Sequence, residues 1–234
     1  MVHLWLRSVQ LVIVMVLLFV VIGAPAPVAR ADESLDVLVA ELNDILASPK
    51  DGTFHVSYEI KLQGQTMGAV FYQKEGRSRL DATTYAGDGS SSSVQIFPTE
   101  TEGVWVVCSG QPAQEPGCES VTYDPIKPGE TFYTAFHNSV FEGALEKGLR
   151  DLAKTDLESG RVERREIVGM DVLVYVFESF PPQEGGAELA FTDDGVIVLI
   201  RAFPPDQEGE SYIQALEFSR DVSDSDFEPP QMPQ

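Results

Sequence analysis

Hydrophobic and polar residues alternate along much of this chain, and the clearest case is the stretch Thr53–Gln73. Its first half has an apolar side chain at every second position: Phe54, Val56, Tyr58, Ile60 and Leu62. A period of two is that of a β-strand with one buried face. Gly64 interrupts the run and Met67–Gln73 resumes it, which predicts a hairpin of two antiparallel strands.

The same alternation recurs almost to the C-terminus and predicts a large antiparallel sheet. Asp193-Asp194-Gly195 stands between two apolar runs, and an Asp-Gly pair in that position is a strong hairpin signal. The further strands predicted are Arg77–Tyr85, Val94–Phe97, Val104–Cys108, one that begins at Cys118, Arg161–Val168, Asp171–Phe177, Glu188–Thr192, Val196–Phe203 and Ser211–Arg220.

Two segments have the period of an α-helix instead. Ser34–Ala47 carries one apolar stripe, as does Thr131–Thr155, which Gly143 and Gly148 interrupt. A helix with a single apolar stripe usually packs against a sheet, so the fold class predicted is α+β. Residues 32–222 of the mature chain are expected to form one domain, followed by an extended acidic and proline-rich tail over 223–234.

The first 31 residues have the organisation of an export signal. Arg7 provides the positive charge, Leu11–Ile22 is uninterrupted apolar sequence, and Ala29-Arg30-Ala31 is a cleavage site with small residues at both ends. We expect cleavage after Ala31 and an extracytoplasmic protein, secreted or periplasmic. The alternative is a membrane anchor that is not cleaved, because Ser8–Ala29 is uncharged and long enough to span a bilayer.

The chain is strongly acidic, with a formal net charge of −21. The leader holds Arg7 and Arg30 and no acidic residue, which leaves 14 basic against 37 acidic residues and a net charge of −23. Such a charge repels phosphate backbones and anionic lipid head groups. We therefore expect no nucleic-acid partner and no electrostatic docking to a membrane, and the charge is typical of a soluble exported protein.

The sequence contains two cysteines, Cys108 at the end of one predicted strand and Cys118 at the start of the next. In an exported chain, two cysteines that flank a Pro/Gly loop predict a structural disulfide across the hairpin. A redox pair is the alternative, but the C-x-x-C spacing typical of such pairs is absent.

The sequence offers no catalytic constellation. The mature chain has two histidines: His137 has no Cys, Asp or Glu partner at the spacing of metal ligands, and His55 lies on the polar side of its predicted strand. Asp81 and Asp88 do not fit the spacing of a calcium loop. The nucleophile-elbow, metalloprotease, P-loop and dinucleotide motifs are absent as well. We expect no enzymatic activity, no metal and no cofactor.

Three short segments carry a resemblance to a known family. Glu166-Ile167-Val168-Gly169-Met170-Asp171-Val172 turns at a glycine between two strands, Thr192-Asp193-Asp194-Gly195 precedes an apolar strand, and Ser225-Asp226-Phe227-Glu228-Pro229-Pro230 closes the chain. Together with the order of helices and strands, they resemble the lipoprotein-carrier (LolA-like) superfamily over most of residues 33–230.

The resemblance implies a strongly curved antiparallel sheet, an incomplete β-barrel with helices packed against its concave face. Members of that superfamily hold an acyl chain or lipid in the apolar cavity between sheet and helices, and related folds sense peptides or lipids in envelope signalling. This chain lacks both a basic patch and a cysteine to carry a lipid anchor. The resemblance therefore implies no specific transport partner for this chain.

Physical reasoning also favours a hydrophobic ligand. A sheet with one apolar face has to cover that face, and two helical segments would cover it incompletely, which would leave an apolar cavity. The alternative is a ligand-free or peptide-sensing envelope module. Alternation shows which residues share a face, but not which face is concave. The candidate lining residues are Val56, Tyr58, Ile60, Phe71, Trp105, Val107, Tyr175 and Leu199.

The leader gives a direct prediction. When the full chain is expressed with export, the mass of the purified protein should match a chain that begins at Asp32. A membrane-bound protein that retains Met1 would show that the apolar segment is an anchor.

Overall fold

In the computed structural model of the chain, the described residues are 40, 42, 44, 45, 52–62, 64–101, 103–110, 117–122, 126, 130–140, 160–180, 185–203 and 211–230. Their strands form one antiparallel sheet in the order β6-β5-β4-β3-β2-β1-β11-β10-β9-β8-β7. The antiparallel sheet predicted from the sequence is confirmed. Its strands are β1 Phe54–Leu62, β2 Gln65–Lys74, β3 Arg77–Tyr85, β4 Ser91–Pro98, β5 Val104–Gly110, β6 Gly117–Thr122, β7 Gly160–Ile167, β8 Met170–Phe180, β9 Gly185–Phe191, β10 Ile197–Phe203 and β11 Ser211–Ser219.

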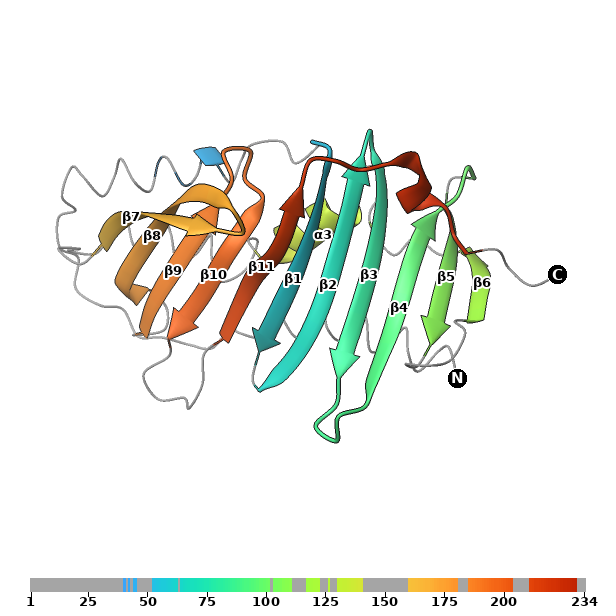
Figure 1. The fold of residues 1–234 in the computed structure, drawn as a ribbon, viewed down its shortest axis with the longest axis horizontal. Helices are drawn as coiled ribbons and strands as arrows, with labels where there is room; N and C mark the ends of the chain where they lie inside the picture. Colours follow the sequence, from blue (N-terminus) through green and yellow to red (C-terminus); the bar gives the residue numbers. More distant parts are fainter. Residues whose placement is uncertain are drawn as a thin grey trace.

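The sheet is made of two meanders that meet in its middle (Figure 1). The chain enters at β1 and moves outward strand by strand to β6 at one edge. It then continues at the opposite edge with β7 and returns inward to β11, which pairs with β1. The sheet is open, with β6 and β7 at its two edges. The pairing of β1 with β11 therefore joins the two meanders into one sheet.

The helix α3, Phe132–Val140, lies in the connection between β6 and β7 and packs against one face of the sheet. Its Tyr133 ring lies 4.9 Å from that of Phe54 in β1, and its Phe136 ring lies 4.9 Å from that of Phe71 in β2. We call this side the helix-covered face and the other side the outer face. Residues 141–155 of the predicted helix lie outside the described part of the chain.

Thr131 caps the start of α3. The Thr131 hydroxyl accepts a hydrogen bond from the Thr134 main-chain N–H (3.1 Å), and the Thr131 carbonyl accepts one from the N–H of Ala135 (2.9 Å). A threonine in this position satisfies an N–H group that has no partner within the helix.

The N-terminal helix predicted over Ser34–Ala47 is described at four residues, and all four are helical: Ala40, Leu42, Asp44 and Ile45. Leu42 is fully buried in the main hydrophobic core, and Ile45 packs against that core. This agrees with an apolar stripe that docks on the sheet. The leader lies outside the described residues.

The C-terminal segment differs from the extended tail expected over 223–234. Asp224–Phe227 forms a short 3₁₀ helix, η2, which packs against β3. Arg79 donates a hydrogen bond to the main chain of η2 (2.7 Å), Arg77 forms an ion pair with Asp224, and Phe227 is buried. The Arg77 guanidinium also lies 4.8 Å from the ring centre of Phe227. The buried Phe227 ring, which Arg77 contacts, and the bond from Arg79 to the main chain of Asp226 therefore order a segment whose composition predicts no structure.

The predicted disulfide is present between Cys108 and Cys118. The two residues are directly opposite each other in the β5–β6 pair, so the bond joins the edge strand β6 to β5, its neighbour among the described strands. Cys108 is buried in a small cluster with Phe97 and Val106.

Removing this bond should destabilise the edge of the sheet. The double substitution Cys108→Ser and Cys118→Ser should lower the free energy of unfolding by roughly 2–3 kcal/mol, the loop-closure entropy for a loop of this length. Urea denaturation of the variant and of the wild-type protein, both without reductant, measures the difference. An unchanged unfolding midpoint would show that the bond contributes nothing to stability.

Candidate functional site

The centre of the helix-covered face is a cluster of aromatic rings. Alternation in β1 and β2 turns Tyr58 and Phe71 toward α3, and the helical period turns Tyr133 and Phe136 back toward the sheet. The ring centres lie 6.0 Å apart for Tyr58 and Phe71, 5.7 Å for Tyr58 and Phe136, and 5.7 Å for Phe71 and Tyr133. These distances and the edge-on geometry of two of the pairs are those of attractive aromatic contacts.

Two tyrosine hydroxyls in this cluster bind the main chain of one residue. The Tyr58 hydroxyl donates to the Ile197 carbonyl (2.7 Å), and the Ile197 N–H donates to the Tyr133 hydroxyl (2.8 Å). Ile197 stands where the β9–β10 register shifts, so these bonds connect β1 and α3 to the second meander. Burial, more than the neighbouring groups, raises the pKa of both phenols well above its ordinary value, so both stay neutral.

Polar side chains fix the start of α3 against the sheet. Gln73 is fully buried; its side-chain N–H donates to the Gly52 carbonyl (3.1 Å), and its side-chain oxygen accepts from the Thr131 hydroxyl (2.6 Å). The main-chain N–H of Phe132 donates to the Ser78 hydroxyl (3.2 Å). Because buried polar groups are costly unless they are paired, these bonds select one position for the helix.

Sequence reasoning missed Gln73 and Ser78 as residues of this site. The signal was present, since each is a polar residue at a position that alternation turns inward: Gln73 follows Phe71 by two, and Ser78 precedes Leu80 by two. A polar residue on the apolar side of a strand indicates a buried partner.

Seven of the eight predicted lining residues share the helix-covered face. Those of β1 and β2, together with Tyr175 in β8, are buried, whereas the two in β5 are half-buried. The Trp105 ring packs against Phe132 of α3, with ring centres 5.0 Å apart, and its indole N–H is buried without a hydrogen-bond partner in the described part of the chain. The seven residues are Val56, Tyr58, Ile60, Phe71, Trp105, Val107 and Tyr175.

Leu199 does not join the other seven, because it lies on the outer face. Its neighbours across the ladder are Gln214 in β11 and Ala190 in β9, whereas Ile200 is paired with Ile213 of the helix-covered face. The register shift between Ile197 and Leu199 interrupts the alternation. The sequence gives no sign of that shift, since residues 196–199 are all apolar and all buried.

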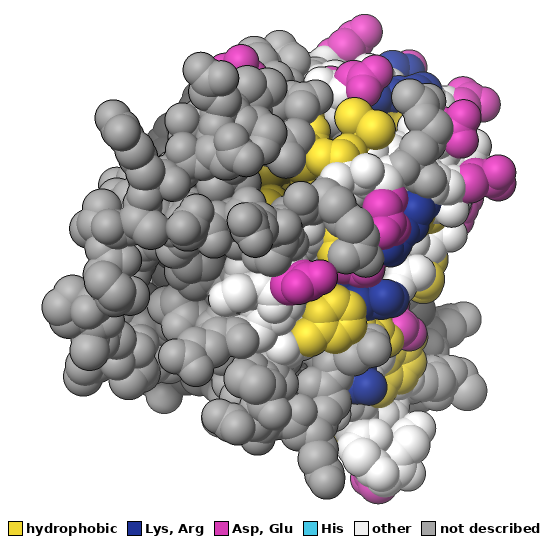
Figure 2. Space-filling model, turned by 90° about the vertical axis from the view of Figure 1, so that its left-hand side faces the viewer, with side chains coloured by type: hydrophobic (Ala, Val, Ile, Leu, Met, Phe, Trp, Pro, Cys, Tyr) yellow, Lys and Arg dark blue, Asp and Glu magenta, His cyan; other side chains and the backbone are white. Residues whose placement is uncertain are grey.

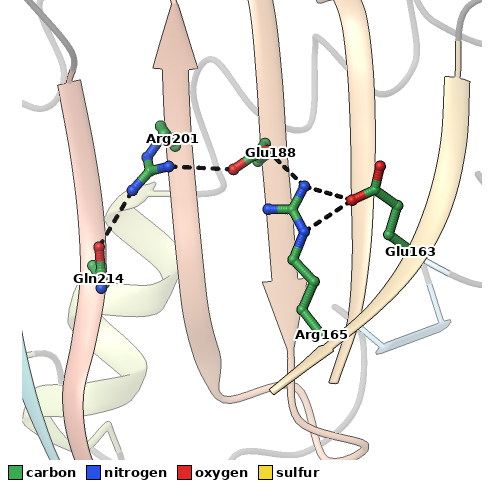
Figure 3. A network of polar contacts seen from close by, with 5 residues as sticks. All are labelled: Glu163, Arg165, Glu188, Arg201 and Gln214. Atoms are coloured by element: carbon green, nitrogen blue, oxygen red, sulfur yellow. Dashed lines mark hydrogen bonds and ion pairs between the residues drawn. The ribbon is translucent and has the colours of Figure 1, made fainter. Parts of the chain in front are cut away.

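The outer face of β7, β9, β10 and β11 carries a chain of polar contacts (Figure 3). Arg165 donates to Glu163 (2.9 and 2.6 Å) and to Glu188 (2.9 Å). On the other side of Glu188, Arg201 forms an ion pair with it at 3.5 Å and also reaches Gln214 at 3.5 Å. The bonds to Glu188 and then Glu163 raise the pKa of Arg165, so this guanidinium stays charged.

Beside this network, an open groove of about 430 Å³ separates the β7–β8 turn from the outer face of β10 and β11. Figure 2 views this end of the molecule and shows acidic and basic side chains next to one another, with hydrophobic side chains between them. Leu216 lies in the bulge of β11 opposite β1 and is 57% exposed. The lining residues are Arg165, Glu166, Ile167, Val168, Leu199, Arg201, Gln214, Ala215 and Leu216.

Within the described ranges, no group of three or more His, Cys, Asp and Glu side chains is placed to hold a metal ion. His137 lies buried on α3 beside Tyr133, with ring centres 6.1 Å apart. The described helices include none long and apolar enough to cross a membrane.

The bonds to Ile197 generate a prediction about stability. Tyr58→Phe should lower the free energy of unfolding by roughly 1–3 kcal/mol, because it leaves a buried carbonyl without its donor. Tyr85→Phe is the control, since Tyr85 is 54% exposed and should tolerate the change. Urea denaturation compares the two variants, and equal midpoints would contradict a structural role for the Tyr58 hydroxyl.

Comparison with known proteins gives little beyond a distant structural similarity. No protein-family model matches the chain, and no curated protein matches it in sequence. Among solved structures, the crystal structure of MucB is similar at a TM-score of 0.37 and 9% sequence identity, over 83% of this chain and 63% of that chain. The chain thus spans less than two thirds of the length of its MucB neighbour. Its function has to be argued from its own residues.

Proposed function

We propose that this protein is exported and holds a hydrophobic molecule, an acyl chain, a lipid or the lipid part of a lipoprotein, between its sheet and its helices. The architecture we propose is that of the lipoprotein-carrier superfamily: an α+β fold in which the helix-covered face is the concave face of an incomplete barrel. The observation that carries the proposal is that the apolar face of the sheet is wider than the described helix α3 that packs on it.

Apolar side chains continue on the helix-covered face from Trp105 in β5 to Tyr175 in β8. Among the described residues, the contacts of α3 with the sheet are concentrated on β2 and β3, while Phe132 also packs against Trp105 in β5 and Tyr133 is bonded to Ile197 in β10. A sheet with one apolar face has to cover it, and a space beside a helix is a common form of ligand site. An acyl chain beside α3 would complete the cover.

Trp105 is where we expect the ligand to meet the protein. It is half-buried at the β5 end of the face, and its indole N–H is buried without an acceptor in the described residues. A tryptophan usually finds a partner for this group when it is buried. An ester or carboxyl oxygen of a lipid would supply the acceptor, with the chain lying along Val107.

The location we propose is outside the cytosol. The disulfide Cys108–Cys118 supports it, because such bonds persist in oxidising compartments and are rare in the cytosol. The acidic charge and the leader agree with export, and an uncleaved leader would instead anchor the same domain to a membrane.

One observation favours a second function, that of an envelope module without a bound lipid. Val56, Tyr58, Phe71 and Tyr175, all expected to line a cavity, are no more than 3% exposed and are packed within the core. A core that is already filled leaves no space for a ligand at those positions. A ligand would then be confined to the half-buried end near Trp105.

Native mass spectrometry tests the proposal on the chain from Asp32 onward, purified without detergent. The expected spectrum contains a species heavier by the mass of an acyl chain or lipid, which denaturation and organic extraction release. Val107→Asn should lose that species, because an amide on the apolar wall disfavours the chain. Val70→Asn is the matched control, since Val70 is a half-buried valine on the outer face of β2.

A wild-type protein of unmodified mass that takes up no fluorescent fatty acid would overturn the lipid proposal. That result would favour the envelope module. Loss of the ligand from Val70→Asn as well as Val107→Asn would show that the effect comes from general destabilisation.

A further inference from the structure

The tip of the β7–β8 hairpin is only partly integrated in the sheet. β8 spans Met170–Phe180, but its described pairing with β9 is limited to Val174–Phe177. The residues before Val174 pair with β7 instead. In Figure 1 this tip crosses in front of β9 and β10, on the side of the sheet opposite α3.

The turn at the tip stores backbone strain. Val168 and Gly169 both have positive φ, 55° and 71°. Two such residues are typical of a two-residue hairpin turn, but asparagine and glycine are the usual occupants, and a β-branched residue there is an outlier. Val168 is half-buried and packs against the main core. Its apolar contact with the outer face offsets the strain of the turn.

Apolar packing holds the tip down. Val172 and Val174 lie on the side of β8 that belongs to the outer face, yet they are 6% and 0% exposed. Ala190 and Leu199 lie on the same face and are 0% and 4% exposed. These side chains, on a side of the sheet that would otherwise face water, are thus buried between the hairpin and the strands next to it.

One ion pair joins the tip to the sheet beneath it. Arg165 of β7 donates to Glu188 of β9, although neither strand pairs with the other in the sheet (Figure 3). The Glu188 side chain is only 11% exposed and interacts with Arg165 and Arg201. A buried carboxylate is stable only with such partners. Opening the hairpin removes Arg165, one of the two guanidinium groups that offset the cost of burying Glu188.

Between the tip and β10–β11 lies the groove of about 430 Å³ described above. One wall belongs to the hairpin, with Ile167 and Val168, and the other to the sheet, with Leu199 and Ala215. Movement of the hairpin therefore changes the width of the groove and the exposure of apolar surface on the outer face.

We propose that the β7–β8 hairpin is a flap over the outer face, closed by the Arg165–Glu188 pair and able to open without unfolding of the sheet. Opening breaks side-chain contacts and that ion pair, which frees the β7–β8 ladder near the tip to fray, and it leaves the ladder between β8 and β9 at Val174–Phe177 intact. The flap is independent of lipid binding on the helix-covered face, so either proposal can fail alone.

Hydrogen exchange measured by mass spectrometry on the chain from Asp32 onward tests the flap. In Glu188→Gln, amides of residues 165–173 should exchange about tenfold faster than in the wild-type protein, the factor for loss of one hydrogen bond to a charged group. Amides of β1–β3 should keep their wild-type rates.

Two further variants make the result specific. Arg165→Gln changes a side chain that is 33% exposed, should fold normally, and should accelerate the same amides. Glu163→Gln is the matched control, because Glu163 and Arg165 both lie in β7 and the Arg165–Glu188 pair remains. Its exchange in residues 165–173 should stay within about twofold of wild type, the effect of a weak ion pair.

Two results would overturn the flap. Wild-type exchange in both Glu188→Gln and Arg165→Gln would show that the ion pair does not hold the hairpin. Equal acceleration in residues 165–173 and in β1–β3 would show that the hairpin opens only when the whole sheet unfolds.

Discussion

The antiparallel pairing of β1 with β11 holds the two halves of the sheet together. It joins the first strand of the sheet to the last, and with them the six-stranded and five-stranded meanders. The hydroxyls of Tyr58 and Tyr133 strengthen the junction by binding both main-chain groups of Ile197, 139 residues from Tyr58. Contacts so distant in sequence are costly in loop-closure entropy, and a helix that bonds to both meanders helps to offset that cost.

The two faces of this sheet solve different physical problems. The helix-covered face buries aromatic rings, with paired polar groups such as Gln73 and Ser78 placed where they fix the helix. The outer face is polar over much of its area and uses arginines to hold two segments against it. Arg77 and Arg79 bind the C-terminal 3₁₀ helix, and Arg165 binds the β7–β8 hairpin to Glu188.

Much of the local structure could be predicted from the sequence, because alternation is a local property. The hairpin in Thr53–Gln73 and the strand Arg77–Tyr85 are found as predicted. Which strands pair over long separations could not be predicted, and the β1–β11 junction is of that kind. The apolar run Val172–Phe177 is typical of a strand buried on both faces, and all of its residues except Leu173 are buried.

For the candidate site, too, alternation could predict which residues of a regular strand share a face. Alternation placed seven of the lining residues on one face, because each lies in a regular strand. It failed for Leu199, where a register shift reverses the inward and outward positions. Composition, rather than alternation, suggested an extended chain for the C-terminal segment. Composition does not show that the one side chain of Phe227 finds a buried position and orders a short helix.

Lipid binding beside α3 can be measured directly through the fluorescence of Trp105. The other tryptophan of the chain, Trp5, belongs to the leader, so a protein that begins at Asp32 contains one indole. Titration of delipidated protein with a long-chain fatty acid should change the emission of Trp105 in a saturable way, and Val107→Asn should weaken the response. Constant emission up to concentrations at which the fatty acid forms micelles would show that no lipid binds beside α3.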